Sequence, residues 1–249
     1  MNEHPDPQGA AGRQPGMIGK ALIKLLMRHA RVSACEALGS RFRLITFEGK
    51  ELRDVTWTTG EKIQVSLGSA FTNRTYTPLN WDALAGTTQI LAFAHGEGPG
   101  SEWARNLKAG DHCHLFGPRH SLDPSPLPAS LIVFGDETSV GLAKALQETR
   151  LPGAVRTILE VDSAYETNAV VAALTLRNAQ LIERSTNNTK SDAVLRAMGI
   201  RMRDMDDGFI LTGKAQSVQA LRSDLKAIGI PTANIMTKAY WAPGKRGLD

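Results

Sequence analysis

SLDPSPLPASLIVFGDETS, residues 121–139, divides the chain into two regions of different character. Its first ten residues contain three prolines, which restrict the backbone and predict a stiff connector over 121–130. The next four, LIVF at 131–134, are wholly apolar and are typical of a strand buried on both faces. GDETS at 135–139 then leads into a helical pattern. We therefore expect one domain to end before this connector and a second domain to begin directly after it.

The region after the connector, 131–249, alternates apolar strand patterns with helical patterns. The strands expected after LIVF are VRTILEV at 155–161, QLIERS at 180–185 and FILTG at 209–213. The clearest helix, over 215–228, has an apolar stripe formed by Val218, Leu221, Leu225 and Ile228. This alternation predicts a doubly wound, mainly parallel sheet with helices on both faces.

The region before the connector has the character of a β domain. From about Arg31 to Pro118, short runs of β-formers are separated by Gly, Asn, Asp and Pro at intervals of about 8–15 residues. These runs predict a small antiparallel β-barrel, closed or nearly closed, in a domain that covers 17–120.

The N-terminal residues divide into a tail and a helix. Residues 1–16 are rich in Gly, Pro and polar residues and predict a flexible tail. Over 17–28, apolar residues recur at helical spacing on one side, and Lys20, Lys24 and Arg28 recur on the other. This basic amphipathic helix could lie on a membrane surface or pack on its own domain, and the sequence leaves both alternatives open.

The composition limits the class of protein. The 249 residues are 42% hydrophobic and 22% charged, which excludes a mostly disordered chain. No apolar run reaches the roughly 18–20 residues of a membrane span, so no stable membrane insertion is expected. The net charge of +4 is small and spread along the chain, which favours anionic small molecules over nucleic acid as partners.

The cysteines and the N-terminus indicate a cellular compartment. Cys35 and Cys113 are too few for a disulfide framework and fit a reducing environment. The polar N-terminus lacks the apolar segment of a secretory signal, so we expect a cytoplasmic protein. His112 and His114 share one face of an expected strand, but two ligands are too few for a metal centre, and none is predicted.

The first motif that indicates chemistry is RTYTP at 74–78. At strand spacing Arg74 and Tyr76 share one face, whereas Thr75 and Thr77 lie on the other. Arginine holds a pyrophosphate by bidentate hydrogen bonds, tyrosine offers a flat apolar surface with a hydroxyl, and threonine can hydrogen-bond a polar ring. The motif fits a flavin dinucleotide, although an ordinary edge strand with a surface arginine would carry the same residues.

The second motif is HGEGPGSEWA at 95–104. Its glycines allow a close approach of backbone to ligand, and Ser101 can cap a helix whose free N–H groups would point at a phosphate. The alternative is a glycine-rich turn before a capped helix, in which His95 has only a structural role.

The third motif, GDETS, stands between a buried strand and a helix, where doubly wound sheets bind nucleotide phosphates. It lacks the G-x-G-x-x-G fingerprint, and Asp136 and Glu137 would repel a phosphate unless they point toward the flavin or the nicotinamide. Glu160, near the end of the second expected strand, is a candidate partner for a ribose hydroxyl, or else it lies at a solvated strand end.

Taken together and in this order, the motifs resemble the siderophore-interacting protein family, within the ferredoxin-reductase-like flavoenzymes. The resemblance covers roughly residues 31 to 244. The segments that carry it are RTYTP, HGEGPGSEWA, GDHCHLFGP, VFGDETS, LEV and the C-terminal AYWAPG.

The resemblance implies FAD on the barrel, NADH or NADPH on the second domain, and reduction of ferric siderophores in the cytoplasm. It implies that the strand motif holds the flavin, that the glycine-rich segment lies at its phosphates or adenosine, and that the YW pair covers the ring. The residues expected to bind the flavin or the nicotinamide nucleotide are Arg74, Thr75, Tyr76, Thr77, His95, Gly98, Ser101, Trp103, Asp136, Glu137, Thr138, Glu160, Tyr240 and Trp241.

A basic rim beside the flavin would attract an anionic ferric chelate, and Lys238, Lys245 and Arg246 are the candidates for it. The expected function is therefore transfer of electrons from NAD(P)H through FAD to a ferric siderophore, with release of ferrous iron. Two alternatives stay open. One is a flavin reductase whose acceptor is a small redox protein or a quinone, and the other is a binding module that holds a ferric chelate without turnover.

Overall fold

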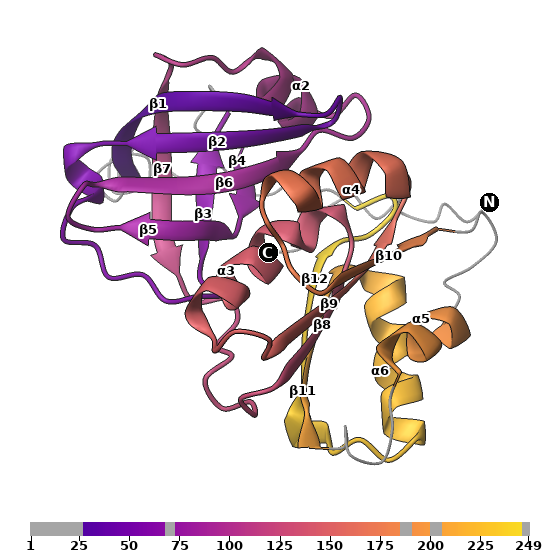
Figure 1. Cartoon of the computed structure of the whole chain (residues 1–249). Helices are drawn as coiled ribbons and strands as arrows, with labels where there is room; N and C mark the ends of the chain where they lie inside the picture. Colours follow the sequence, from indigo (N-terminus) through magenta and orange to yellow (C-terminus); the bar gives the residue numbers. More distant parts are fainter. Residues whose placement is uncertain (1–26, 68–72, 185–190, 200–205, 246–249) are drawn as a thin grey trace, which may run out of the picture.

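The computed structural model describes residues 27–67, 73–184, 191–199 and 206–245. In it the chain forms two β-sheets (Figure 1). The first sheet is antiparallel and has seven strands in the order β4-β3-β7-β1-β2-β6-β5. Its strands are β1 (Met27–Leu38), β2 (Phe42–Glu48), β3 (Lys62–Ser66), β4 (Asn73–Tyr76), β5 (Pro78–Asp82), β6 (Thr87–Phe93) and β7 (His112–Arg119). The outermost strands, β4 and β5, are separated in the chain by Thr77 alone, so the sheet curls into the expected barrel. Side chains such as Val32, Ile45 and Leu115 are fully buried in its interior.

The second sheet is parallel, with five strands in the order β10-β9-β8-β11-β12. Its strands are β8 (Leu131–Gly135), β9 (Val155–Val161), β10 (Ala179–Glu183), β11 (Gly208–Lys214) and β12 (Ile235–Trp241). The first strand in sequence, β8, lies in the middle, so the chain reverses its direction of winding between β8 and β11. The expected doubly wound sheet is confirmed, and this reversal is the place where such sheets bind ligands.

Helices cover both faces of the parallel sheet (Figure 1). One face packs on α3 (Val140–Thr149) and α4 (Ala164–Ala173), and the other packs on α5 (Ser191–Met198) and α6 (Ala215–Ala227). The stripe predicted from the sequence explains α6, because Val218, Leu221 and Leu225 are buried against the sheet. The remaining helix, α2 (Pro99–Asn106), belongs to the barrel domain.

The barrel and the parallel sheet share one hydrophobic core. Phe42, Leu79 and Leu91 of the barrel lie in the same buried cluster as α3 and β8. The proline-rich segment 121–130 contributes to it as well, because Leu122 and Leu127 are buried there. This shared core fixes the position of the barrel relative to the carboxyl edge of the sheet.

The N-terminal helix expected over 17–28 differs from the structure at its end. Residues 27 and 28 already belong to β1, which pairs with β7 from Met27 onward. The backbone hydrogen bonds offered by β7 favour an extended strand there over a helix. Residues 1–26, with the expected tail and the rest of that helix, lie outside the described residues. Within the described part of the chain, no helix combines the length and the apolar character that crossing a membrane requires.

Candidate functional site

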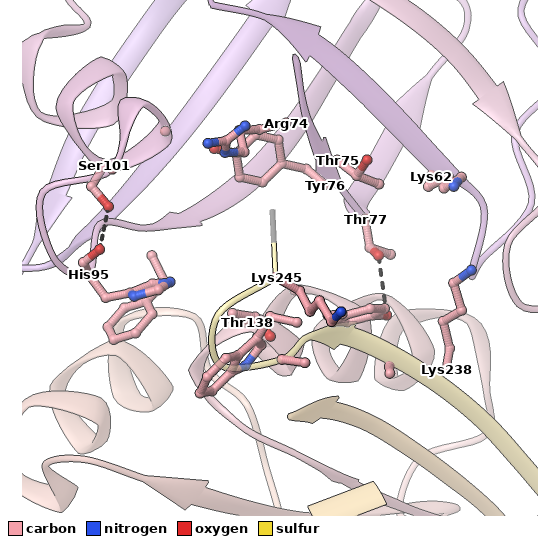
Figure 2. A pocket seen from close by; sticks show the side chains of 18 of the residues that line it. Lys62, Arg74, Thr75, Tyr76, Thr77, His95, Ser101, Thr138, Lys238 and Lys245 are labelled. Carbon is pink, nitrogen blue, oxygen red and sulfur yellow. Dashed lines mark hydrogen bonds between the residues drawn. The ribbon is translucent and has the colours of Figure 1, made fainter. Parts of the chain in front are cut away.

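A cavity of about 490 Å³ lies where the barrel meets the carboxyl edge of the parallel sheet (Figure 2). Its barrel wall comes from β4, from Thr77 and from the glycine-rich segment before α2. Its sheet wall comes from the start of α3, the end of β12 and the residues that follow β12. The volume lies within the range of roughly 300–1,000 Å³ that is usual for small-molecule and cofactor sites.

The predicted strand motif forms the centre of the barrel wall. Arg74, Thr75, Tyr76 and Thr77 all line the cavity. The sequence assigned the two threonines to the opposite face of a strand, but both line the cavity, and Thr77 lies between β4 and β5. Burial raises the pKa of the Tyr76 hydroxyl well above its usual range, so Tyr76 is neutral at physiological pH.

Arg74 lies against the first turn of α2. A Cβ added at Gly100 would be 2.9 Å from Nε of Arg74, so the glycine leaves the space that the guanidinium stem occupies. The helix starts from Gly98, which offers no side-chain cap to the first-turn N–H groups. At this end of the cavity the guanidinium is the group that suits a phosphate, because Pro99 has no N–H and the Ser101 and Glu102 N–H groups donate to the Gly98 carbonyl at 2.9 and 3.1 Å.

The other predicted residues of the glycine-rich segment divide into lining and supporting residues. His95, Gly98 and Ser101 line the cavity, and the Ser101 hydroxyl donates to the His95 carbonyl at 2.6 Å. Trp103 lies outside the lining. Its ring centroid is 6.0 Å from that of Tyr76, within the barrel core, so Trp103 supports Tyr76 from behind.

The sheet wall carries the predicted YW pair and two lysines. Tyr240, Trp241, Lys238 and Lys245 line the cavity. The Tyr240 hydroxyl lies 3.4 Å from the Thr77 hydroxyl across it, and burial raises the pKa of Tyr240 to about 12. Figure 2 shows Lys238 on the same side of the cavity as Lys62. The third predicted cation, Arg246, lies outside the described residues.

One residue of the GDETS motif, Thr138, borders the cavity, and its two acidic residues do not. Thr138 lines it, whereas Asp136 is buried and accepts hydrogen bonds from Thr138, from the Lys214 backbone N–H at 2.8 Å and from the Trp241 indole N–H at 2.7 Å. Burial raises the pKa of Asp136, and the hydrogen bonds from Thr138 and Trp241 oppose that rise. Asp136 thus ties the ends of β8, β11 and β12 together and fixes the indole that faces the cavity.

Glu137 and Glu160 face away from the cavity. Glu137 accepts the Asp162 backbone N–H at 2.6 Å and pairs with Arg184 at 3.0 Å. Glu160 accepts the Ser217 hydroxyl at 2.8 Å, and 4% of its side chain is exposed. Neither carboxylate lines the cavity, and both are held inside the protein by hydrogen bonds. The carboxylate oxygens of Glu137 and Glu160 are therefore not exposed for the predicted contacts, which were with the nicotinamide nucleotide and with a ribose.

Lys62 was not predicted from the sequence; it is at the start of β3 and lines the cavity although it is largely buried. A lysine at the start of the apolar run KIQVSL is the signal that could have indicated it. Within the described residues, no group of three or more His, Cys, Asp or Glu side chains could hold a metal ion.

These features fit a flavin dinucleotide. The cavity provides a guanidinium at one end and aromatic and hydroxyl side chains on its two walls. A Cβ added at Gly98 would meet nothing within 4 Å, so backbone is exposed to a ligand there. Tyr76 lines this space beside Arg74 and gives the barrel wall an aromatic side chain.

Comparison with protein families gives a match over residues 66–122 to the siderophore-interacting FAD-binding domain. This segment contains β4, the glycine-rich segment, α2 and β7. The match confirms the family resemblance predicted from the sequence, and it lies within the barrel domain. Comparison with curated protein sequences finds no match.

Comparison with solved structures shows the fold of ferredoxin-reductase-like proteins. The chain is similar to a siderophore-interacting protein from Acinetobacter baumannii, with 16% identity, a TM-score of 0.71 and coverage of 88% of this chain and 92% of that one. It is also similar to a siderophore utilization protein from T. fusca, with 20% identity, a TM-score of 0.69 and coverage of 90% and 95%. A ferredoxin NADP⁺ reductase from Neisseria gonorrhoeae, solved with FAD and NADP, gives 17% identity, a TM-score of 0.67 and coverage of 86% and 98%.

Proposed function

We propose that this protein is an oxidoreductase that passes electrons from a nicotinamide nucleotide through FAD to a ferric siderophore and releases ferrous iron. The observation that carries the proposal is the position of the cavity. The cavity lies between the barrel wall, which carries the RTYT residues 74–77, and the carboxyl edge of a doubly wound sheet, where nucleotides bind in such folds. The FAD-binding match of residues 66–122 supports the cofactor, and the likeness to siderophore-interacting proteins supports the acceptor.

In this proposal the barrel wall holds FAD. Arg74 would neutralise the pyrophosphate, and Tyr76 and Thr77 would contact the ring system, since all three residues line the cavity. When bound, FAD supplies the conversion between a two-electron donor and a one-electron acceptor such as ferric iron. The protein itself binds, orients and shields the reactants, so no acid–base or nucleophilic triad is needed.

The sheet wall serves the two substrates. Thr138 lies where the nicotinamide nucleotide would approach, and Trp241, fixed by Asp136, borders the same space. Lys238 and Lys245 line the cavity and supply positive charge for an anionic, oxygen-rich chelate; Lys62 adds a third cation from the barrel. Ferrous iron is then released because hard oxygen ligands hold the ferrous ion far less tightly than the ferric ion.

The test is anaerobic mixing of the flavin-loaded protein with each nicotinamide, followed by a panel of iron chelates and a ferrous trap. Bleaching of the flavin by a nicotinamide and a trap signal with a siderophore are the expected results. Bleaching without a trap signal, together with electron transfer to a redox protein or a quinone, would select a different acceptor. A flavin that no nicotinamide bleaches would leave a binding module. The cytoplasmic location expected from the sequence stays a prediction, which fractionation of cells would test.

A further inference from the structure

Three aromatic rings line one side of the cavity, and they come from both of its walls. Phe93 ends β6 and His95 follows two residues later, so both belong to the barrel, whereas Trp241 ends β12 of the sheet. In the view of Figure 2, His95 lies on the opposite side of the cavity from Lys62 and Lys238. These rings are therefore separate from the lysines that the proposed function assigns to the iron chelate.

The three rings form one continuous row. The centroids of the Phe93 and His95 rings are 5.3 Å apart, with an angle of 27° between their planes. The centroids of the His95 and Trp241 rings are 6.1 Å apart, with an angle of 40°. Both distances lie within the roughly 4.5–7 Å over which aromatic pairs are favourable. His95 is thus the ring that joins the barrel wall to the sheet wall.

Cations hold the two ends of this row. Arg41, in the turn between β1 and β2, pairs with Glu166 of α4, and its guanidinium carbon lies 5.1 Å from the centroid of the Phe93 ring. At the other end, Nζ of Lys214 lies 6.0 Å from the centroid of the Trp241 ring. A cation within about 6 Å of a ring centroid is attracted to the ring. The two outer rings therefore have partners of their own, and His95 lies between them.

The middle ring is the exposed one. His95 is exposed, whereas Phe93 and Trp241 are half-buried. Hydrophobic stabilisation follows the apolar area removed from water, so an exposed ring adds little to the stability of the core. Replacement of the His95 side chain should therefore leave the fold intact. Its contribution is the flat surface that it offers to the indole.

The indole of Trp241 needs such a second contact. Its N–H donates to Asp136 at 2.7 Å, which fixes one edge of the ring. A ring attached at Cβ and held at its N–H can still pivot about the line that joins these two points. The contact with His95 limits this pivot from the barrel side. The plane of the indole, which lines the cavity as Thr138 does, is therefore set by both domains.

Resting on the proposed function, we propose that His95 is a positioning residue. It sets the plane of Trp241 and so the width of the space in which a nicotinamide nucleotide meets the flavin. Hydride transfer depends steeply on this geometry, because reacting atoms must come within about 3–3.5 Å of each other in the correct orientation. The flat ring of His95 performs this role, and neither a hydrogen bond nor a charge of the imidazole is required.

The first test needs no turnover and is made on the full chain before FAD is added. The near-ultraviolet circular dichroism of the wild type minus that of Trp241→Phe gives the signal of this indole. His95→Gln keeps hydrogen-bonding groups but removes the ring, and it should lose most of the signal. His95→Phe keeps a ring without those groups and should retain the signal. A full Trp241 signal in the glutamine variant would overturn the inference.

The second test measures bleaching of the bound flavin by saturating NADH or NADPH. His95→Gln should slow bleaching about fivefold, whereas His95→Phe should stay within about twofold of the wild type, as should the FAD affinity of both variants. His112→Gln is the matched control, because His112 is exposed on β7 and lies outside the cavity lining. A slow phenylalanine variant, or an FAD affinity that falls together with the rate, would overturn the inference.

A double variant shows whether His95 acts through the indole. In a Trp241→Leu background, His95→Gln should slow bleaching no further, because no indole is left to position. Losses that multiply in the double variant would overturn the inference. If the glutamine variant does not fold, His95→Ala takes its place in all three measurements, since it also removes the ring.

The outcomes separate this inference from the function on which it rests. If a nicotinamide bleaches the flavin equally fast in the wild type and the glutamine variant, the positioning role is wrong and the proposed reductase stands. If no nicotinamide bleaches the flavin, the proposed reductase is wrong, and the dichroism of Trp241 alone decides the role of His95.

Discussion

The barrel wall and the sheet wall of the cavity are built in different ways. On the barrel wall, four consecutive residues of one strand motif, 74–77, line the cavity directly. On the sheet wall, the GDETS motif contributes Thr138 to the lining. Asp136 is buried and holds Trp241 of that wall, and Glu137 is buried and pairs with Arg184 outside the cavity. The barrel motif is thus suited to contact a ligand, whereas most of the sheet motif fixes the residues that do.

Because of this difference, substitutions on the two walls should affect different properties, namely ligand affinity on the barrel wall and protein stability on the sheet wall. Side chains that point into the cavity have few partners of their own, so their loss should weaken binding and leave the fold intact. Buried carboxylates with several donors have the opposite character, because their removal leaves those donors unpaired inside the protein. Four substitutions test this comparison.

The largest effect is expected for Asp136→Ala. It leaves the Lys214 backbone N–H and the Trp241 indole N–H without their acceptor, and the free energy of unfolding should fall by about 3 kcal/mol. Chemical denaturation followed by circular dichroism measures the loss. Glu148→Ala, which removes an exposed carboxylate paired with Lys144, should cost about 0.5 kcal/mol. A stable Asp136 variant with a normal Trp241 environment would contradict the role given to this carboxylate.

On the barrel wall, Arg74→Ala should weaken FAD binding and leave the stability of the flavin-free protein unchanged. Loss of hydrogen bonds between a guanidinium and a phosphate costs about 2 kcal/mol, which is roughly a thirtyfold rise in the dissociation constant. Flavin fluorescence on titration measures it. Arg105→Ala, near the other end of α2, is the control, because Arg105 pairs with the exposed Glu97 and lies outside the cavity. Unchanged FAD affinity would remove Arg74 from the site.

Between the two walls, Glu166→Gln tests the ion pair that joins α4 to the barrel turn. Hydrogen bonds from Ser40 and Arg41, together with the Arg41 charge, lower the pKa of Glu166, against the effect of burial. A carboxylate with a lowered pKa stabilises the protein above its ordinary pKa near 4.5, and this stabilisation disappears as the pH falls through the folded-state value.

The variant should therefore lose about 1 kcal/mol of stability at neutral pH, and the difference from wild type should narrow below about pH 4.5. Denaturation at a series of pH values measures this narrowing. A difference that is constant from pH 7 to acid pH would show that the charge of Glu166 contributes nothing to the stability of the interface.

The smallest effect is expected for Gly100→Ala. The new Cβ would lie 2.9 Å from Nε of Arg74, so the flexible arginine must leave its present rotamer at a cost of about 0.5–1.5 kcal/mol. FAD affinity should fall about threefold. In an Arg74→Ala background the same change should have no further effect, since there is no guanidinium to displace. Additive losses in the double variant would assign Gly100 a role of its own.

The strands that the sequence did not predict have a common physical cause. The strand β5 begins with Pro78 and contains Asn80 and Asp82, which disfavour strands, yet it pairs with β6. All residues of β12 are half-buried, so it shows no alternation, and its pairing with β11 holds it in the sheet. Strand pairing supplied by distant segments overrides local preference, and one sequence window does not contain that information.

Local patterns in the sequence determined the order of a barrel followed by a doubly wound sheet, the residues of the barrel motif and the family resemblance, because each depends on spacing within one short segment. Only the tertiary structure decided that Lys62 joins the cavity, that Glu137 and Glu160 turn inward to Arg184, and that Asp162 stays exposed. The physical reason is that the direction of a charged side chain is set by the partner it finds. Here those partners come from other elements up to 121 residues away in the chain.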